Sequence, residues 1–354
     1  MNHHIRKLTS RAVKGKRVLV RVDFNVPMKG SRVVDDFRIR ASLPTIQYIK
    51  KHGGIPIVIT HLEPVRPVEP VMERAMKLAK FRFEYLENLR FQEGEEANDA
   101  VYARALAKFG DVYVNDAFSV AHRAHASVVR LPKLLPSYMG LSFAHELKML
   151  SAIRHPKRPF VFILGGIKFD TKVGVLAHYM QHADTIFIGG GLANTFLAAT
   201  GTSVGSSHIE KDAISRIKKK YLKSPVILPI DVVLNGHKTV FVGDVPQSGV
   251  VLDIGESSIA ALAPILKRAH TVLWNGPMGH TEKGYTTGSK RLIKILVRMK
   301  GTVVIGGGDT HVLIRRSLKR IPTHMRISTG GGAMLVYLGT GKLPGLSALQ
   351  HKQS

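Results

Sequence analysis

The stretch Thr302–Thr310, TVVIGGGDT, joins a short apolar run to three glycines, a carboxylate and a hydroxyl. Val303–Ile305 is β-branched, as a buried parallel strand would be, and the apolar spacing of His311–Leu318 predicts a helix. Glycines between a strand and a helix N-terminus let the backbone approach an anion closely, because no Cβ atom holds the anion away. The backbone at Gly307 and Gly308 is therefore expected to bind phosphate.

Asp309 stands at the edge of this glycine turn, and two roles are open to it. Its carboxylate can cap the following helix, or it can hold Mg²⁺ against a nucleotide phosphate. The stretch alone favours the cap. Its pattern is neither GxGxxG nor GxxxxGK[ST], so the standard dinucleotide and P-loop signatures do not apply.

Other apolar runs in the second half also end in glycine-rich or polar turns. Phe160–Leu164 leads into Gly165 and Gly166, Thr185–Ile188 into Gly189 and Gly190, and Thr271–Leu273 into Asn275, Gly276 and Pro277. Repeated turns of this kind at one edge of a parallel sheet form a nucleotide crevice.

Two lysines, Lys168 and Lys172, follow the first of these turns. Their spacing of four predicts that both ammonium groups lie on one helix face, where they would suit a polyphosphate. The alternative is a solvated helix face. Further along, Ser328–Gly332 (STGGG) opens the last long helix and offers another nest of backbone amides.

The first half has polar side chains where its strands end. Asp23 and Asn25 follow the buried run Val18–Val20, and His61 follows Ile55–Thr60. Polar groups in these places indicate a binding site in an open α/β sheet, and hydrogen-bonded strand ends are the alternative. The loop AHRAHAS adds Arg123 between two histidines, and we interpret it as an anion contact rather than a metal site.

Composition narrows the class of protein. A chain of 354 residues predicts two domains, and the lack of cysteine excludes disulfides and thiolate metal sites. No apolar run is long enough for a bilayer and the N-terminus lacks a signal sequence, so we expect a cytoplasmic protein without membrane contact. The net charge of +27 is spread over both halves. It favours a general compositional bias with an anionic substrate over dedicated nucleic-acid binding.

Many motifs occur in the order found in phosphoglycerate kinases, and the chain resembles that family from Lys14 to Leu349. They are RVDFNVP, DDFRIRASLPTI, LENLRF, NDAFS, AHRAHAS, RPFVFILGGIK, IGGGLANTF, LPIDVV, LDIG, WNGPMG, GGGDT and ISTGGGA. The resemblance implies two doubly wound parallel-sheet (Rossmann-like) α/β domains joined by a helix. It also implies reversible phosphoryl transfer between 1,3-bisphosphoglycerate and ADP, giving 3-phosphoglycerate and ATP, with Mg²⁺ as cofactor, in a monomer that closes its two domains.

The resemblance also assigns roles to residues. Phosphoglycerate would be held by Asp23, Asn25, Arg38, His61, Arg66, Arg123 and Arg158. The nucleotide would be held by Gly165, Gly166, Lys172, Gly189, Gly190, Asn275, Pro277, Glu282, Gly307, Gly308, Asp309 and Thr310, with Asp309 on the metal. Lys168, Arg38 and the amides of Gly331 and Gly332 would stabilise the transferring phosphoryl group. A catalytically weak scaffold that binds nucleic acid nonspecifically is the competing hypothesis.

The implied domains are a phosphoglycerate-binding domain (1–142), a linking helix (143–155), a nucleotide-binding domain (156–335) and a C-terminal segment (336–354) that returns to the first domain. The family's HLGRP appears here as HLEPVRP, so we interpret Arg66 as a displaced counterpart of that arginine. The stretch from there to LENLRF is shorter than in the family by about one helix–strand–helix unit, judged against a βαβ unit.

Overall fold

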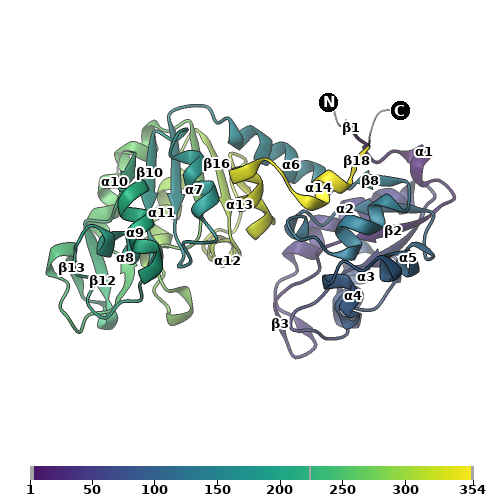
Figure 1. The fold of residues 1–354 in the computed structure, drawn as a ribbon, viewed down its shortest axis with the longest axis horizontal. Coiled ribbons are helices and arrows are strands. Elements are labelled where there is room, and N and C mark those ends of the chain that lie inside the picture. The colour runs from purple at the N-terminus through teal and green to yellow at the C-terminus, as the bar shows by residue number, and fades with distance from the viewer. Residues whose placement is uncertain (1–3, 223–224, 352–354) are drawn as a thin grey trace. The chain divides into compact units, whose positions relative to one another are not determined.

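The computed structural model describes residues 4–222 and 225–351 and divides into two compact units. The first unit comprises residues 1–150 and 341–354, and the second comprises 151–340. The division falls inside helix α6 (Leu141–Arg154), so the predicted linking helix spans the change of unit (Figure 1). The C-terminal segment is assigned to the first unit from Gly341, five residues later than the predicted Val336.

The first unit contains a five-stranded parallel sheet in the order β6-β5-β2-β7-β8. Its strands are β2 (Arg17–Arg21), β5 (Ile55–Ile59), β6 (Glu84–Tyr85), β7 (Val112–Asn115) and β8 (Ser137–Met139). Helices α2 (Phe37–Lys51) and α3 (Glu69–Ala79) pack on a shared apolar core with β2 and β5. Between β5 and β6 the chain forms the single helix α3, which agrees with the shortened stretch noted in the sequence.

Short elements complete the first unit. They are α1 (Ser10–Val13), the hairpin β3 (Met28–Lys29) and β4 (Arg32–Val33), α4 (Glu93–Glu96) and α5 (Ala100–Ala107). Near the end of the chain, α14 (Pro344–Ala348) is held by a hydrogen bond from the Gly345 amide to the Ala121 carbonyl. The terminal strands β1 (His4–Ile5) and β18 (Gln350–His351) pair antiparallel, so both chain ends lie in this unit.

The second unit is built on a six-stranded parallel sheet in the order β11-β10-β9-β15-β16-β17. The strands are β9 (Phe160–Leu164), β10 (Thr185–Ile188), β11 (Val226–Ile227), β15 (Thr271–Asn275), β16 (Thr302–Gly306) and β17 (Met325–Ile327). A second, antiparallel sheet consists of β12 (Asp231–Leu234), β13 (Thr239–Phe241) and β14 (Val251–Ile254).

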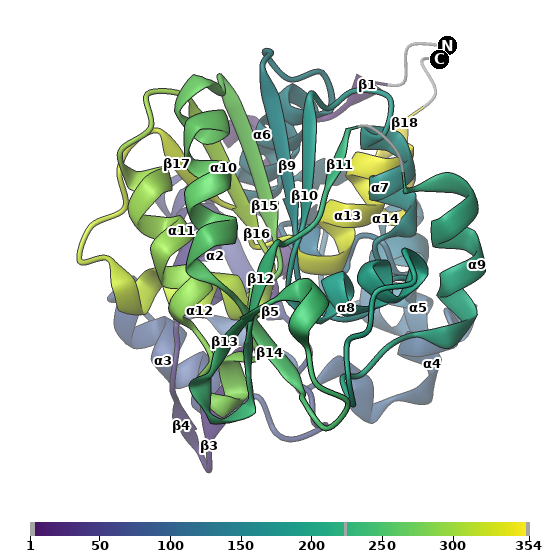
Figure 2. The same cartoon turned by 90° about the vertical axis from the view of Figure 1, so that its left-hand side faces the viewer.

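Helices cover both faces of the six-stranded sheet (Figure 2). One face carries α7 (Val173–Tyr179), α8 (Gly190–Ala199), α9 (Lys211–Lys220) and α13 (Gly331–Thr340). The other carries α10 (Glu256–Arg268), α11 (Thr287–Val297) and α12 (Gly308–Ser317). This is the arrangement that right-handed crossovers produce when the strand order grows outward in both directions from β9 and β15. The prediction of doubly wound parallel α/β units is thus confirmed.

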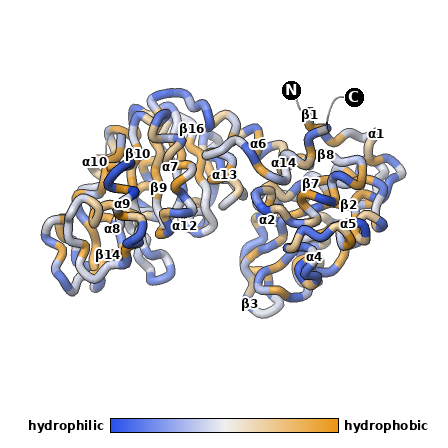
Figure 3. The backbone as a smooth tube through the Cα atoms, viewed as in Figure 1, coloured by the Kyte–Doolittle hydropathy of each residue, from blue (hydrophilic) through white to orange (hydrophobic). Residues whose placement is uncertain are grey.

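Hydropathy follows this layering. The strands at the centre of each sheet consist mainly of hydrophobic residues, whereas α9 consists mainly of hydrophilic ones (Figure 3). Only Ala213 and Ile217 of α9 are buried, and Lys218–Lys220 are exposed. The lysine run therefore lies on a solvated helix face.

Asp116 anchors the start of α6 within the first unit. Its Oδ1 accepts hydrogen bonds from the amides of Ser142 (2.9 Å) and Phe143 (3.1 Å). Burial raises the pKa of Asp116 to about 7, against the opposing effect of those hydrogen bonds and of Thr45 and Ser42. The carboxyl group is therefore a helix cap that holds its proton more tightly in the folded chain than in the unfolded one.

We expect Asp116→Asn to flatten the pH dependence of stability. Between the unfolded pKa of 3.8 and the folded value of about 7, the folded chain keeps a proton that the unfolded chain has lost. The free energy of unfolding contributed by Asp116 therefore falls as pH rises through this window, by at most about 1.4 kcal/mol per pH unit. Urea unfolding of parent and variant across the window measures the difference.

Asp99→Asn is the matched control. Asp99 caps α5 through the Tyr102 amide, and that hydrogen bond lowers its pKa. Its contribution to stability is present above the unfolded pKa and is lost as pH falls, which is the opposite sign. Parallel stability curves for the parent and Asp116→Asn would contradict the expectation for Asp116.

Candidate functional site

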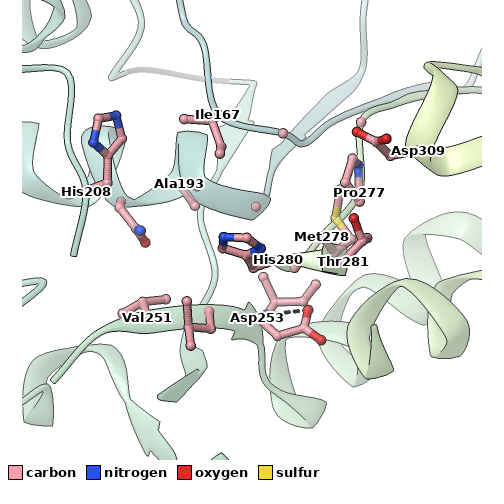
Figure 4. A pocket seen from close by; sticks show the side chains of 18 of the residues that line it. Ile167, Ala193, His208, Val251, Asp253, Pro277, Met278, His280, Thr281 and Asp309 are labelled. Carbon is pink, nitrogen blue, oxygen red and sulfur yellow. Dashed lines mark hydrogen bonds between the residues drawn. The ribbon is translucent and has the colours of Figure 1, made fainter. Parts of the chain in front are cut away.

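A pocket of about 480 Å³ lies at the carboxyl ends of the parallel strands of the second unit. Its lining comes from the turns after β9, β15 and β16, the start of α8, and strand β14 (Figure 4). Most of the predicted nucleotide residues line it, namely Gly166, Lys172, Gly190, Asn275, Pro277, Glu282, Gly307, Gly308, Asp309 and Thr310, and so does the predicted catalytic residue Lys168. The sequence thus located this cavity through its glycine turns.

Two of the glycine turns pack backbone against backbone. A Cβ atom on Gly190 would lie 2.6 Å from the Pro277 carbonyl oxygen, and one on Gly276 would lie 2.5 Å from the Gly165 carbonyl carbon. Both glycines also have positive φ, +61° and +87°. Side chains here would push the turns apart, so glycine sets how closely the pocket walls approach.

Gly165 and Gly189 lie behind the lining. A Cβ atom on either would collide with the side chain of Met278, which does face the pocket. Their predicted role in the adenosine pocket is therefore corrected to packing that supports Met278. Gly331 and Gly332 begin α13, and the pocket lining does not include them. The α13 residue Met334 packs close to Gly306, so this helix start lies near the end of β16.

The lysine prediction needs a correction. Helix α7 begins at Val173, so Lys168 and Lys172 lie in the preceding loop rather than on one helix face. Both still line the pocket, because the glycine turn after β9 folds the loop over it. Lys168 is exposed, whereas Lys172 is buried, and this burial lowers its pKa although Glu210 opposes the shift. An anion in the pocket would offset the cost of burying the Lys172 ammonium.

Two buried polar atoms in the pocket wall lack a hydrogen-bond partner. They are Thr310 Oγ1 and Asn194 Oδ1, and their residues are 0% and 3% exposed. Such atoms are costly unless a ligand satisfies them. Asp309 is exposed beside Thr310 near the start of α12, where the cap residue is Gly307 and no side-chain capping bond forms. The helix-cap interpretation of Asp309 is therefore wrong.

The pocket lining also contains residues that the sequence analysis did not single out. Val251 and Asp253 of β14 face His280 and Met278 (Figure 4). Burial raises the pKa of Asp253, while the amides of Gly288 and Ile254 donate to its carboxylate and oppose the shift. The motif LDIG was visible in the sequence, but only the packing of β14 across the pocket reveals where its carboxylate lies.

The first unit holds a group of four arginines and one histidine, the arginine cluster, made of Arg21, Arg38, His61, Arg90 and Arg123. Arg38 Nη1 lies 2.9 Å from Asp23 Oδ2 and donates to the Asn25 carbonyl. Burial disfavours the Asp23 anion, but the charge of Arg38 and a hydrogen bond from Ser119 oppose this effect, and the pKa of Asp23 is lowered. The predicted residues Asp23, Asn25, Arg38, His61 and Arg123 are thus brought together.

His61 is neutral in this setting. Burial lowers its pKa to about 2, and the neighbouring charges of Arg21, Arg90 and Arg123 act in the same direction against Asp23. Arg21 Nη2 lies 3.2 Å from His61 Nδ1. His61 therefore serves as a hydrogen-bonding group rather than as a cation.

Arg90 joins the cluster although the sequence analysis did not single it out, and Arg158 belongs to the other unit. Arg90 lies in a 3₁₀ turn (Leu89–Phe91), and its side chain is 3% exposed within the cluster. Arg158 instead forms bidentate hydrogen bonds with Asp184 just before β9, at the amino edge of the second unit's sheet. The motif LENLRF, which contains Arg90, was visible in the sequence, but only the packing of its turn shows where the side chain lies.

Arg66 lies in the loop between β5 and α3. Its Nε donates to the carbonyl of Pro64 in its own loop (3.2 Å). The loop residue that reaches the cluster is Glu63, which pairs with Arg90 and with Arg123. The role of Arg66 as a displaced substrate-binding arginine stays a prediction.

Comparison with known proteins agrees with this geometry. The family model described as phosphoglycerate kinase matches residues 8–84 and 67–342. The chain belongs to the phosphoglycerate kinase family. The two matched ranges overlap at residues 67–84, a segment that includes helix α3. The stretch between HLEPVRP and LENLRF, which the sequence analysis found shorter than in the family, contains the same helix.

Relatives match at full length. The phosphoglycerate kinase of Roseiflexus sp. (strain RS-1) is 39% identical over 383 residues, covering 95% of this chain and 96% of that protein. That of Pelotomaculum thermopropionicum is also 39% identical, with 96% and 98% covered. The solved phosphoglycerate kinase from Coxiella burnetii is 28% identical with a TM-score of 0.84, covering 98% of this chain and 99% of that one. The one from Pyrococcus horikoshii OT3 is 26% identical with a TM-score of 0.87, and 98% of each chain is covered.

Proposed function

We propose that this chain transfers a phosphoryl group reversibly between 1,3-bisphosphoglycerate and ADP, giving 3-phosphoglycerate and ATP. The observation that carries the proposal is the pocket of the second unit, where Lys168, Lys172 and Asp309 surround glycine turns in a chain that belongs to this family. None of the comparisons supports the alternative of a nucleic-acid-binding scaffold. A monomeric state and a cytoplasmic location stay predictions of the sequence.

The nucleotide phosphates would lie along the glycine turns of the second unit. Lys172, Asn275 and the Thr310 hydroxyl would contact them, which would satisfy the unpartnered Thr310 oxygen. The base would lie beside the apolar side chains of Ala193, Val251 and Met278. The exposed Glu282, which also lines the pocket, is available to the ribose. The polar and apolar residues of the lining thus match the two ends of a nucleotide.

The donor set fits Mg²⁺ held mainly by the substrate. Asp309 supplies one exposed carboxylate at the phosphate end, and Mg²⁺ commonly binds one or two carboxylates together with phosphate oxygens. Among residues 4–222 and 225–351, no group of three or more His, Asp or Glu side chains is arranged to hold a metal ion. When bound, the ion would neutralise charge on the nucleotide phosphates.

Phosphoglycerate would bind to the arginine cluster of the first unit. Arg38, Arg90 and Arg123 offer fixed guanidinium donors for its carboxylate and phosphate, and neutral His61 and Asn25 supply further hydrogen bonds. Asp23 keeps Arg38 in place through their ion pair. Arg21 is buried and donates hydrogen bonds to the Ser127 hydroxyl and to the Val22 carbonyl, so its guanidinium is already engaged within the protein.

The chemistry requires positioning and charge neutralisation rather than a general base. A carboxylate oxygen of 3-phosphoglycerate attacks the terminal phosphorus of ATP, and the bond from that phosphorus to the bridging oxygen of ADP breaks. The attacking carboxylate is already ionised, so no proton needs to be removed. Lys168, exposed at the phosphate end of the pocket, would stabilise charge on the transferring group.

Lys168→Ala tests this role in a coupled assay for ATP formation. We expect kcat to fall by at least about a hundredfold with nearly unchanged nucleotide affinity, because the charge acts mainly in the transition state. Arg216→Ala, which removes an exposed cation paired with Asp170 in the same unit, serves as the control. A kcat within a few-fold of the parent would refute the assignment, and an inactive parent would refute the proposed function.

Asp309→Ala tests the metal site. We expect it to weaken binding of MgADP far more than binding of ADP in the presence of a chelator, because the carboxylate contacts the nucleotide through the ion. Calorimetric titration of both forms measures the two affinities. Equal losses would show that Asp309 does not act through the metal.

Arg90→Ala and Arg158→Ala separate the two arginines at saturating nucleotide. Loss of a charge-assisted contact costs roughly 1.5–3 kcal/mol, so Arg90→Ala should lower kcat/KM for phosphoglycerate by about 10–100-fold. Arg158→Ala should leave kcat/KM within a few-fold of the parent value, because its guanidinium is engaged by Asp184. The reverse order of effects would restore the original assignment of Arg158.

A further inference from the structure

Glu63 introduces a carboxylate into the arginine cluster. It lies in the loop after β5, where the sequence reads HLEPVRP, and its amide donates to Asn25 Oδ1 at 3.1 Å. One carboxylate oxygen, Oε1, contacts Nη1 of Arg90 and lies 3.9 Å from Nη1 of Arg123. A single anionic oxygen is thus shared by two guanidinium groups.

Two arginines of the cluster, Arg21 and Arg90, also lie near other acidic side chains. Arg21 lies 4.0 Å from Glu95, and the Nε of Arg90 lies 3.3 Å from Glu96. Burial lowers the pKa of Arg90, and the positive charges of Arg123 and Arg21 add to this although Glu96 opposes it. Glu63 therefore places negative charge beside both Arg90 and Arg123, because its Oε1 lies near Nη1 of each.

The Glu63 side chain is able to leave this position. It is 45% exposed, whereas the Arg90 side chain is 3% exposed and is fixed by its surroundings. A half-exposed ion pair contributes little free energy, because water screens it and competes for both groups. The guanidinium groups are therefore a permanent anion position, and Glu63 is its replaceable occupant.

We propose that Glu63 fills the position between Arg90 and Arg123 until an anion displaces it, so that it raises the concentration at which any anion occupies this position. The inference rests on the proposed function of the first unit as the phosphoglycerate site. Every anion that enters must replace a carboxylate, so displacement lowers all anion affinities by a similar free energy. An anion with further contacts at Arg38 and His61 offsets this cost, whereas a small anion such as sulfate does not.

Calorimetric titration of 3-phosphoglycerate and of sulfate into the parent and Glu63→Gln tests the proposal. Glutamine keeps the size of the side chain and removes the charge. We expect both ligands to bind about three- to tenfold more tightly, and inhibition of turnover by sulfate to increase by the same factor. The Arg90 ion pair with Glu96 remains, so the variant is expected to fold.

Glu69→Gln is the matched control. It makes the same change in net charge at an exposed residue that begins α3, six positions along the chain. A general electrostatic effect would tighten binding equally in both variants and would overturn the proposal. Unchanged affinity in Glu63→Gln, together with a lower midpoint of thermal unfolding, would show that Glu63 only relieves repulsion between the arginines.

Glu63→Asp keeps the charge but withdraws the carboxylate from the two guanidinium groups. It should tighten sulfate binding by a smaller factor than Glu63→Gln, and no change would count against displacement even if Glu63→Gln did not fold. Failure of the parent to bind 3-phosphoglycerate would refute the proposed function. The sulfate titrations would then still decide whether Glu63 occupies an anion position.

Discussion

The pocket of the second unit depends on backbone segments that pack so closely that no Cβ atom fits between them. Gly190 and Gly276 bring the turns after β10, β15 and β9 together at distances that exclude any side chain. This contact sets the pocket's width and aligns the amides and polar side chains around it. The positions of Lys172, Asn275 and Thr310 depend on the same turns, so glycine governs both the cavity and its chemistry.

In the first unit, several guanidinium groups lie close together and would repel one another without acidic partners. Each buried or half-buried guanidinium has an acidic partner: Asp23 for Arg38, Glu95 for Arg21, and Glu96 with Glu63 for Arg90. Partners of this kind hold the donors in position while the folded chain avoids unpaired buried charge. Asp23 and Glu95 are buried, whereas Glu63 and Glu96 are about half exposed. Of these two exposed partners, Glu63 is the one that lies near both Arg90 and Arg123.

The two proposed sites would therefore bind anions by different physical means. The second unit uses backbone amides, helix starts and two lysines, which suit a polyphosphate whose oxygens lie close to the chain. The first uses planar guanidinium groups, which suit separate carboxylate and phosphate groups. This division matches a reaction in which one substrate donates a phosphoryl group and the other presents an oxygen to accept it.

The sequence by itself determined the doubly wound fold, the glycine turns and the family, because β-branched runs, glycine spacing and motif order are local properties of the chain. Most of the nucleotide-binding residues it predicted, including Asp309 and Thr310, do line the pocket. The sequence did not decide which helix starts where, so Lys168 and Lys172 were expected on a helix that begins only at Val173.

Only the tertiary structure decided which charged residues meet. Arg90 and Arg158 are both arginines beside a short apolar run, but Arg90 is buried among cations in the first unit, whereas Arg158 pairs with Asp184 in the second unit. Arg66 and Glu63 lie three residues apart, and loop geometry alone brings the acid to the cluster. Such pairings depend on contacts between distant segments, and no periodicity or spacing within one segment encodes them.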